Sequence, residues 1–288
     1  MNETYLHHME CILRVLVYIE KHLGEELFLG KLAKIAHISP YYFHRLFHAY
    51  MGETVSDYVT RLRMQRASEK LNYTDAAVTE IALEVGYETP SSFTKVFNQV
   101  MGESPRAFRR SMRPIVETML KRVPQDLSEI PFAPKYVERK EEEVLFIRKV
   151  GPYAETPWQG FNDLLAFLNQ EKVSREEIKA FYSMGLDDPH FVPLSKCRFD
   201  ACVALKKRHI PKGEVGLKIL PGGKCAVFVH KGSYNEIETF FQKIFTTWYP
   251  TANITLADVA PFCEHLELGD ERIPMAERTT YLYIPLED

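Results

Sequence analysis

The chain has 288 residues, a formal net charge of −3 and 45% hydrophobic residues. This length allows one large or two ordinary domains, and the apolar content suffices for buried cores, which excludes a disordered chain. No apolar run approaches the length of a membrane span, and the N-terminus has no cationic region typical of a signal peptide. We therefore expect a globular protein located in the cytoplasm.

The cysteines indicate neither disulfides nor a metal site. There are five of them, an odd number, at positions without a zinc-binding spacing: Cys11, Cys197, Cys202, Cys225 and Cys263. We expect reduced thiols with structural roles, no bound metal and no cofactor.

A helix is predicted near the N-terminus, within residues 5–23. Its apolar residues fall on one stripe: Ile12, Val15, Leu16, Ile19 and Leu23. Gly24 ends this pattern, as glycine commonly does after a helix. We expect the helix to pack against the helical motif that follows it.

Residues 81–109 predict two short helices joined by a tight turn. Apolar residues recur at spacings of three and four on both sides of a break: Ile81, Ala82, Val85, Phe93, Val96, Phe97 and Met101. Gly86 can take a positive φ in the turn, and Pro90 suits the first position of the second helix. This pattern is typical of a helix-turn-helix.

The same pattern occurs about fifty residues earlier, where residues 38–54 align with residues 88–104. His37 stands near the place that Gly86 takes in the second copy, and histidine tolerates left-handed backbone better than most residues. The stretch Thr54–Leu71 between the copies predicts one connecting helix of about 27 Å. On such a strut, two recognition helices can reach successive major-groove segments about 34 Å apart.

The side chains that face away from the apolar stripes are candidates for DNA contacts. In the first copy they are Tyr41, Tyr42, His44, Arg45 and His48, and in the second copy Ser91, Ser92, Thr94 and Lys95. Arg45 is predicted to contact a guanine, because arginine pairs with the two acceptors of that base. Lys34 and Arg109 are predicted to contact phosphates.

The second copy reads I-A-x-x-V-G-Y-x-x-x-S-x-F-x-K-x-F, and G-x-S-P-x-x-F-R follows it. This resembles the signature of the AraC/XylS family of transcriptional regulators, over roughly Leu27–Arg110. The resemblance implies an all-α domain with two helix-turn-helix motifs, assigned to residues 1–113, that binds double-stranded DNA. It also implies RNA polymerase as a partner, while activation and repression both stay open.

Residues 114–135 are interpreted as a linker, because prolines recur there among polar residues. Residues 136–288 then show strand and helix patterns in an order that repeats. Strands are predicted at 143–150, 180–186, 201–206, 224–230, 261–268 and 280–285, and helices at 155–169 and 234–248. Two such strand–helix–strand–strand units predict an α+β domain whose antiparallel sheet has a central groove, where a ligand can bind.

Several short motifs of this half are similar to the GyrI-like effector domain. They are Gly151-Pro152-Tyr153, residues 220–227, Gly232-Ser233-Tyr234, Trp248 and Pro261-x-x-Glu264. The resemblance implies a small-molecule effector. Leu266 stands where many members have a tyrosine.

Glu264 is the predicted anion of the ligand site. Alternation along residues 261–268 puts it on one face with Phe262, Leu266 and Leu268. A carboxylate among apolar neighbours is expected to be paired, to have a raised pKa, or to await a cationic ligand. The alternatives are that the strand is turned over or that a neighbouring lysine satisfies Glu264. A cage for a flat or cationic ligand is predicted from the aromatic side chains Tyr153, Tyr182, Phe228, Tyr234, Trp248, Tyr281 and Tyr283.

Two alternatives concern the C-terminal half alone. Some GyrI-like domains resemble hydrolases of reactive small molecules, but the sequence indicates no nucleophile–base pair, and we expect no enzyme. The half could instead be a docking module for polymerase or another protein, with no ligand.

Overall fold

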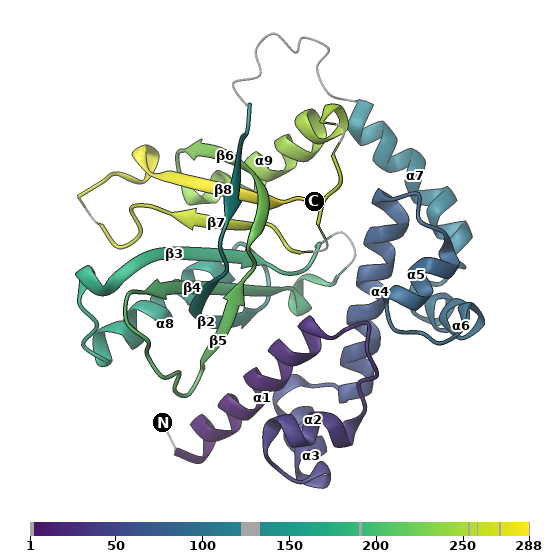
Figure 1. Ribbon diagram of the computed structural model, residues 1–288, viewed down its shortest axis with the longest axis horizontal. Coiled ribbons are helices and arrows are strands. Elements are labelled where there is room, and N and C mark those ends of the chain that lie inside the picture. Colours follow the sequence, from purple (N-terminus) through teal and green to yellow (C-terminus); the bar gives the residue numbers. More distant parts are fainter. Residues whose placement is uncertain are drawn as a thin grey trace. The chain divides into compact units, whose positions relative to one another are not determined.

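The structure is a computed structural model, and it describes residues 3–121, 133–189, 192–252, 254–257, 259–270 and 272–287. The chain divides into two compact units, a helical unit mainly within residues 1–118 and a second unit that holds most of the residues from 119 on. Both predicted kinds of domain are present, one of helices and one built on a β-sheet (Figure 1). No helix in the described ranges is long and apolar enough to cross a membrane.

The helical unit contains seven helices in its described residues: α1 (Glu3–Lys21), α2 (Leu29–Ala36), α3 (Pro40–Met51), α4 (Val55–Tyr73), α5 (Val78–Glu84), α6 (Pro90–Met101) and α7 (Pro105–Lys121). Helices α2 and α3 form the first predicted helix-turn-helix, and α5 and α6 form the second. Helix α1 packs against α2, which confirms its predicted place.

The turns of the two helix-turn-helix motifs have the same backbone conformation. His37 and Gly86 both take left-handed φ angles, of 58° and 84°. The N–H of the next residue then donates back to the helix before the turn, from Ile38 to the Ala33 carbonyl at 3.1 Å and from Tyr87 to that of Ala82 at 2.9 Å. These bonds satisfy carbonyls that the helix end leaves open. The strained φ of His37 shows that the first turn keeps its form without glycine.

The connecting helix α4 is 19 residues long and contacts α3, α5 and α6, so the predicted strut is confirmed. Helix α7 differs from the prediction, because it continues through Pro114 to Lys121, into the stretch that we interpreted as linker. A proline inside a helix removes one backbone donor and is a signal for a helix end, but here the helix continues past it. Residues 122–132 of the predicted linker lie outside the described residues.

The second unit is built on one eight-stranded sheet in its described residues. Its elements are β1 (Lys135–Arg139), β2 (Glu142–Val150), α8 (Thr156–Gln170), β3 (Ile178–Gly185), β4 (Arg198–Leu205), β5 (Val215–Leu220), β6 (Gly223–Lys231), α9 (Ile237–Lys243) with a π-helical turn (Ile244–Trp248), β7 (Phe262–His265) and β8 (Thr279–Pro285). Short 3₁₀ turns lie at 175–177, 194–196, 234–236, 249–251 and 275–277.

The strand order β1-β6-β8-β7-β3-β4-β2-β5 confirms the duplication and extends it. In each repeat a long strand, β2 or β6, is followed by a helix and then by two further strands. The strands within each repeat pair antiparallel, as β2–β4 and β3–β4 in the first and β6–β8 and β7–β8 in the second. The sequence did not predict β1 and β5. Each of them precedes the long strand of its own repeat but pairs with the long strand of the other, so the two repeats exchange a strand.

The exchange forces the sheet to curl. Only two residues connect β1 to β2, yet six strand spacings separate these strands in the sheet order. In a flat sheet that separation is about 29 Å, whereas so short a connection spans at most about 11 Å. The connections β1–β2 and β5–β6 therefore meet, and a Cβ on Gly222 would lie 2.9 Å from the Arg139 carbonyl oxygen.

Helices α8 and α9 cover one face of the sheet, and their cores include Leu164 and Phe240. We call the opposite face, which the curl encloses, the inner face. Its side chains are also buried, since Phe146, Tyr182 and Phe262 are at most 4% exposed. The predicted groove is thus largely filled by the protein's own side chains.

Candidate functional sites

The outward face of α3 is as predicted for a recognition helix. Phe43, Leu46 and Phe47 are buried in the helical core. The exposed side of the helix carries Tyr41, Tyr42, His44, Arg45 and His48. The helix starts with Pro40 after an N-cap at Ser39, whose hydroxyl accepts from the backbone N–H of Tyr42.

Arg45 is held at the surface by Tyr41. Its Nη1 donates to the Tyr41 hydroxyl at 3.2 Å, and the guanidinium lies 5.9 Å from the ring centroid. Tyr41 itself is 73% exposed. Arginine has five N–H donors, so one bond to tyrosine leaves donors for a base edge. The pair is an oriented, exposed donor group on the candidate DNA-binding face.

Tyr42 is engaged within the fold. Its hydroxyl bonds the His8 Nε2 at 2.6 Å, and the two rings meet edge to face. This contact ties α3 to α1. The geometry favours a positioning role for Tyr42 over the predicted direct base contact.

The outward face of α6 carries shorter side chains than that of α3. Ser91, Ser92 and Lys95 are exposed, while Thr94 is half-buried. The hydroxyl protons of two of them are used locally, because Ser92 donates to the Thr89 carbonyl at 2.8 Å and Thr94 to the Pro90 carbonyl at 2.7 Å. The oxygens can still accept from a base, and Ser91 and Lys95 supply the donors of this face.

The two predicted phosphate contacts differ in their surroundings. Lys34 is exposed in the last turn of α2. Arg109 instead donates to the backbone carbonyls of Leu71 at 3.2 Å and Ala76 at 2.7 Å, which joins α7 to the end of α4. The predicted phosphate role of Arg109 is therefore not supported, since its guanidinium already bonds the Leu71 carbonyl, which the end of α4 leaves open, and the Ala76 carbonyl of the following connection.

The inner face of the sheet brings together the most distinctive set of side chains in the second unit. We define the Arg139 cluster as Arg139, Glu142, Tyr182, Phe262, Glu264 and Tyr283. Tyr182 lies opposite Glu264 in the β3–β7 register, and Phe262 lies opposite Tyr283 in the β7–β8 register. Residues opposite each other share a face, so the register places these four side chains together.

Glu264 is half-buried in this cluster, and Tyr283 donates a hydrogen bond to its Oε2 at 2.6 Å. Burial, and then this hydrogen bond, raises the pKa of Tyr283 above its ordinary value, so the phenol stays protonated at neutral pH. Within the described residues Glu264 has no ion pair. The internal lysine considered for Glu264 is thus not its partner in the structure.

The alternation that we predicted around Glu264 holds only in part. Phe262 lies on the inner face, and Cys263 packs into the core beneath α9. Strand β7 ends at His265, however, and Leu268 packs into the core beneath α8. The period of two fails there because residues 266–269 form a turn.

The other predicted cage residues are divided between the two faces. Tyr281 is the register partner of Glu264 and lies on the inner face. On the helix-covered side, Phe228 and Trp248 pack ring to ring at 4.8 Å, and Tyr234 lies 4.9 Å from the His265 ring. These buried contacts fill the core, so the structure does not support a ligand role for those three residues.

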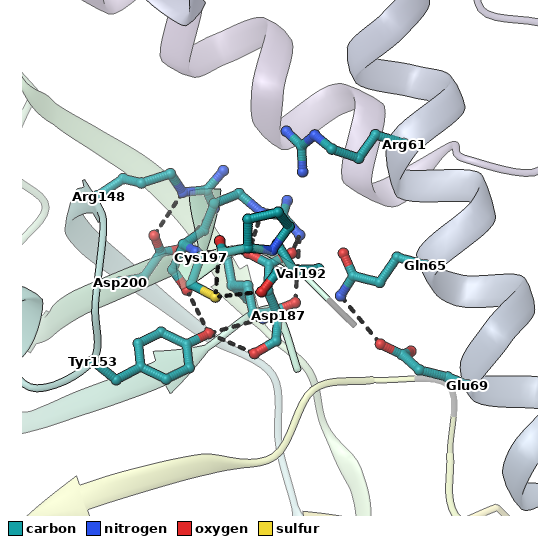
Figure 2. Close-up of polar contacts among 12 residues, drawn as sticks. Arg61, Gln65, Glu69, Arg148, Tyr153, Asp187, Val192, Cys197 and Asp200 are labelled. Atoms are coloured by element: carbon teal, nitrogen blue, oxygen red, sulfur yellow. Dashed lines mark hydrogen bonds and ion pairs between the residues drawn. The ribbon is translucent and has the colours of Figure 1, made fainter. Parts of the chain in front are cut away.

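Tyr153 also belongs to the fold. Figure 2 shows its hydroxyl directed at the segment around Asp187, where it donates to the backbone carbonyl at 2.7 Å and accepts from the backbone N–H at 3.0 Å. Burial raises the pKa of Tyr153 above its ordinary value. A phenol satisfied in both directions is a structural group, and its predicted ligand role is not supported.

Next to the Arg139 cluster, the inner face holds a buried ionic group. Asp200 is fully buried and pairs with Arg148 at 2.7 Å (Figure 2). It also pairs with Lys218 at 2.6 Å. Burial alone would raise the pKa of Asp200, but the two cations hold it well below its ordinary value. The two cations donate hydrogen bonds to both carboxylate oxygens of Asp200. These three charged groups are therefore structural and do not form a binding site.

Two comparisons with protein families agree with this architecture. The profile of a helix-turn-helix domain matches residues 32–111, and that of the GyrI-like small molecule binding domain matches residues 132–287. The chain belongs to the GyrI-like family. Its helical unit is an AraC-type helix-turn-helix domain, as the sequence resemblance indicated.

Known relatives match the AraC-type part. Regulatory protein PocR of Salmonella typhimurium is 37% identical over 99 residues, which are 34% of this chain and 33% of PocR. Transposon Tn10 TetD protein of Escherichia coli is 33% identical over 104 residues, which are 36% of this chain and 75% of TetD. The solved C-terminal domain of AraT, a response regulator from Geobacillus stearothermophilus, is 34% identical, with 35% of this chain and 84% of that chain covered and a TM-score of 0.35. The chain thus spans about a third of the length of PocR.

The sequence did not indicate two members of the cluster in the GyrI-like domain, Arg139 and Glu142. Strand β1, which carries Arg139, is short, charged and mostly exposed, so it lacks the alternation of a buried strand. The duplication did not reveal it either, because its counterpart β5, which precedes β6, was also not predicted.

Proposed function

We propose that the protein is a transcriptional regulator whose AraC-type domain binds double-stranded DNA, with RNA polymerase as a further partner. The observation that supports DNA binding is the pair of matched recognition helices, α3 and α6. Each begins with a proline after a capping residue, exposes its polar face and contacts the connecting helix α4. Their different outward residues suit an asymmetric site, with base contacts from α3 and phosphate contacts from residues such as Lys34.

Selection of bound duplexes from a random DNA pool tests this proposal. We expect two unlike half-sites whose centres are about one helical turn apart, because the chain presents one pair of recognition helices. Enrichment of no sequence, or of one half-site only, would contradict the role of the pair. Co-purification of RNA polymerase on the selected DNA tests the second partner.

We further propose that the GyrI-like domain senses an aromatic cation on its inner face. The support is chemical, since the Arg139 cluster combines three aromatic rings with two carboxylates, Glu142 and Glu264. Ring faces attract cations, and the carboxylates add charge.

Titration with N-methylquinolinium and with neutral quinoline at pH 8, followed by calorimetry, tests the ligand. We expect the cation to bind more tightly than its neutral analogue, and Tyr182→Leu to weaken the binding of both. Tyr136→Leu is the matched control, because Tyr136 is 61% exposed on β1 and outside the cluster. Equal binding by wild type and Tyr182→Leu would place the ligand elsewhere.

The hydrolase alternative has one observation in its favour. Ser183 and His265 form a hydrogen bond of 2.8 Å, the nucleophile–base geometry that the sequence did not indicate. Both side chains are buried, and burial lowers the pKa of His265 to about 3, which makes it a weak base. We therefore propose binding without catalysis. Hydrolysis of 4-nitrophenyl acetate that Ser183→Ala abolishes would contradict this.

A further inference from the structure

The aromatic site on the inner face already holds a cation of the protein itself. The guanidinium carbon of Arg139 lies 4.7 Å from the ring centroid of Phe262, 4.8 Å from that of Tyr283 and 5.2 Å from that of Tyr182. The rings of Phe262 and Tyr283 are stacked, with an interplanar angle of 8°. These distances are those at which aromatic faces attract a cation. Arg139 thus has the geometry of a ligand in an aromatic cage.

The polar contacts of Arg139 are poor for so buried a group. Its side chain is 11% exposed, and its Nη2 reaches the Glu142 carboxylate and the Tyr182 hydroxyl only at 3.5 Å each. Its Nη1 is buried and has no hydrogen-bond partner among the residues that the structure describes. Arg148 on the same face differs, because it holds Asp200 through two bonds of 2.7 and 2.8 Å. A buried donor without a partner destabilises the arrangement that contains it.

The strand that carries Arg139 lies at an edge of the sheet and is more exposed than the central strands. Arg139 is the last residue of β1, which is an edge strand that pairs only with β6. Four of the five residues of β1 are exposed, whereas only two of the nine residues of β2 and none of the eight residues of β4 are exposed. The side chain can leave the cage by rotation at the strand end, without loss of the ladder between β1 and β6.

We infer that Arg139 is a built-in competitor for the aromatic site: it fills the cage in the unliganded protein, and an aromatic cation binds by displacing it. This inference rests on the proposed ligand function. It means that the free-energy cost of moving Arg139 sets the ligand concentration at which the domain responds. A ligand must offer more than a positive charge, because it has to replace a cation that is already there. A flat aromatic cation does so by stacking on the rings.

Affinity measurements on Arg139 variants test the inference. Arg139→Gln removes the internal cation, so we expect N-methylquinolinium to bind at least tenfold more tightly than to wild type, with a smaller gain for quinoline. Arg139→Lys keeps a cation in the cage and should stay near wild type. Equal or weaker binding of N-methylquinolinium to Arg139→Gln overturns the competitor role while ligand sensing stands. Failure of all three folded proteins to bind N-methylquinolinium overturns the proposed ligand function, and the inference with it.

A second measurement uses the wild type alone, so it does not depend on how a variant folds. Phenylglyoxal modifies accessible arginine side chains, and mass spectrometry of peptides reports the rate at each position. We expect N-methylquinolinium to accelerate the modification of Arg139 several-fold, because displacement moves it into water. Arg148 is the internal control, since its pair with Asp200 stays buried in both states. Unchanged or slower modification of Arg139 at saturating ligand overturns the inference.

Discussion

The charge of Glu264 is predicted to favour cationic over neutral ligands, and the size of this effect can be derived from the structure. Glu264 lies 2.6 Å from the Tyr283 hydroxyl, and the Arg139 guanidinium lies 4.8 Å from the centre of the same ring. A ligand cation at that position is therefore roughly 7 Å from the carboxylate. At an effective dielectric constant of about 20, this separation corresponds to about 2 kcal/mol. Partial exposure of Glu264 reduces the value to about 1–2 kcal/mol, or five- to thirty-fold in affinity.

The measurement should be made in the Arg139→Gln background. In wild type the internal cation and the ligand cation compete for the same place, so removal of the Glu264 charge weakens both and the net change is small. In Arg139→Gln, the further change Glu264→Gln is expected to lower the affinity for N-methylquinolinium five- to thirty-fold and to leave that for quinoline unchanged. Calorimetric titration of both compounds measures the ratio. Glu238→Gln, on the exposed side of α9, is the matched control.

The stability of the protein should hardly change, because the amide oxygen of glutamine can still accept the Tyr283 hydrogen bond. We expect a shift in Tm of less than about 4 °C, corresponding to about 1 kcal/mol. A loss of several kcal/mol would mean that Glu264 holds a buried cation in solution. An unaltered cation-to-quinoline ratio in the Arg139→Gln background would refute the placement of the carboxylate beside the ligand.

Three further predictions concern DNA binding and the fold. Arg45→Ala is expected to cost about 1–3 kcal/mol at the selected site and to relax the preference at one base pair, measured by binding to single-base variants; an equal loss on all sequences would make Arg45 a phosphate contact. Lys34→Ala should reduce the slope of log K against log salt by about one, whereas Arg109→Ala should lower the Tm and leave that slope unchanged at a temperature where the variant is folded. Asp200→Asn leaves buried cations without their carboxylate and should destabilise the GyrI-like domain by about 3–5 kcal/mol, against less than about 1 kcal/mol for Asp163→Asn in an exposed pair. Because the folded pKa of Asp200 lies below its ordinary 3.8, the stabilisation is present above about pH 4 and is lost as the pH falls further, so denaturant melts of wild type and Asp200→Asn should converge in acid.

The sequence predicted the helical domain closely because its signals are local. Capping residues, turn residues and apolar spacing all lie within a few positions of the structure they specify, as Ser39 and Pro40 do at the start of α3. The roles of individual arginines were not predictable in this way. Arg45 and Arg109 both lie next to apolar residues of an amphipathic helix, so the sequence does not distinguish them. Only the fold shows that the backbone carbonyls of Leu71 and Ala76 lie within reach of Arg109.

The ligand site depends on contacts between distant segments, so the sequence predicted it only in part. Alternation placed Glu264 and Phe262 together, but it could not say which aromatic residues of other strands share their face. The register decides this, since Tyr182 pairs opposite Glu264 while Phe228 points to the core beneath α9. Arg139 was missed because β1 pairs with the other repeat, and no local pattern reports an exchanged strand.

The duplication suggests why the stacked rings of Phe262 and Tyr283 lie in the second half of the inner face. The two repeats place equivalent pairs side by side, Arg148 opposite Asp200 in the first and Val229 opposite Tyr281 in the second. In the first half this position is a buried ion pair with bonds on both carboxylate oxygens, so it is closed to a ligand. In the second half the same position has an apolar and an aromatic side chain, and no internal charge pair has to be broken there. A ligand that stacks on those rings therefore displaces Arg139, and the contacts of Asp200 with Arg148 and Lys218 stay intact.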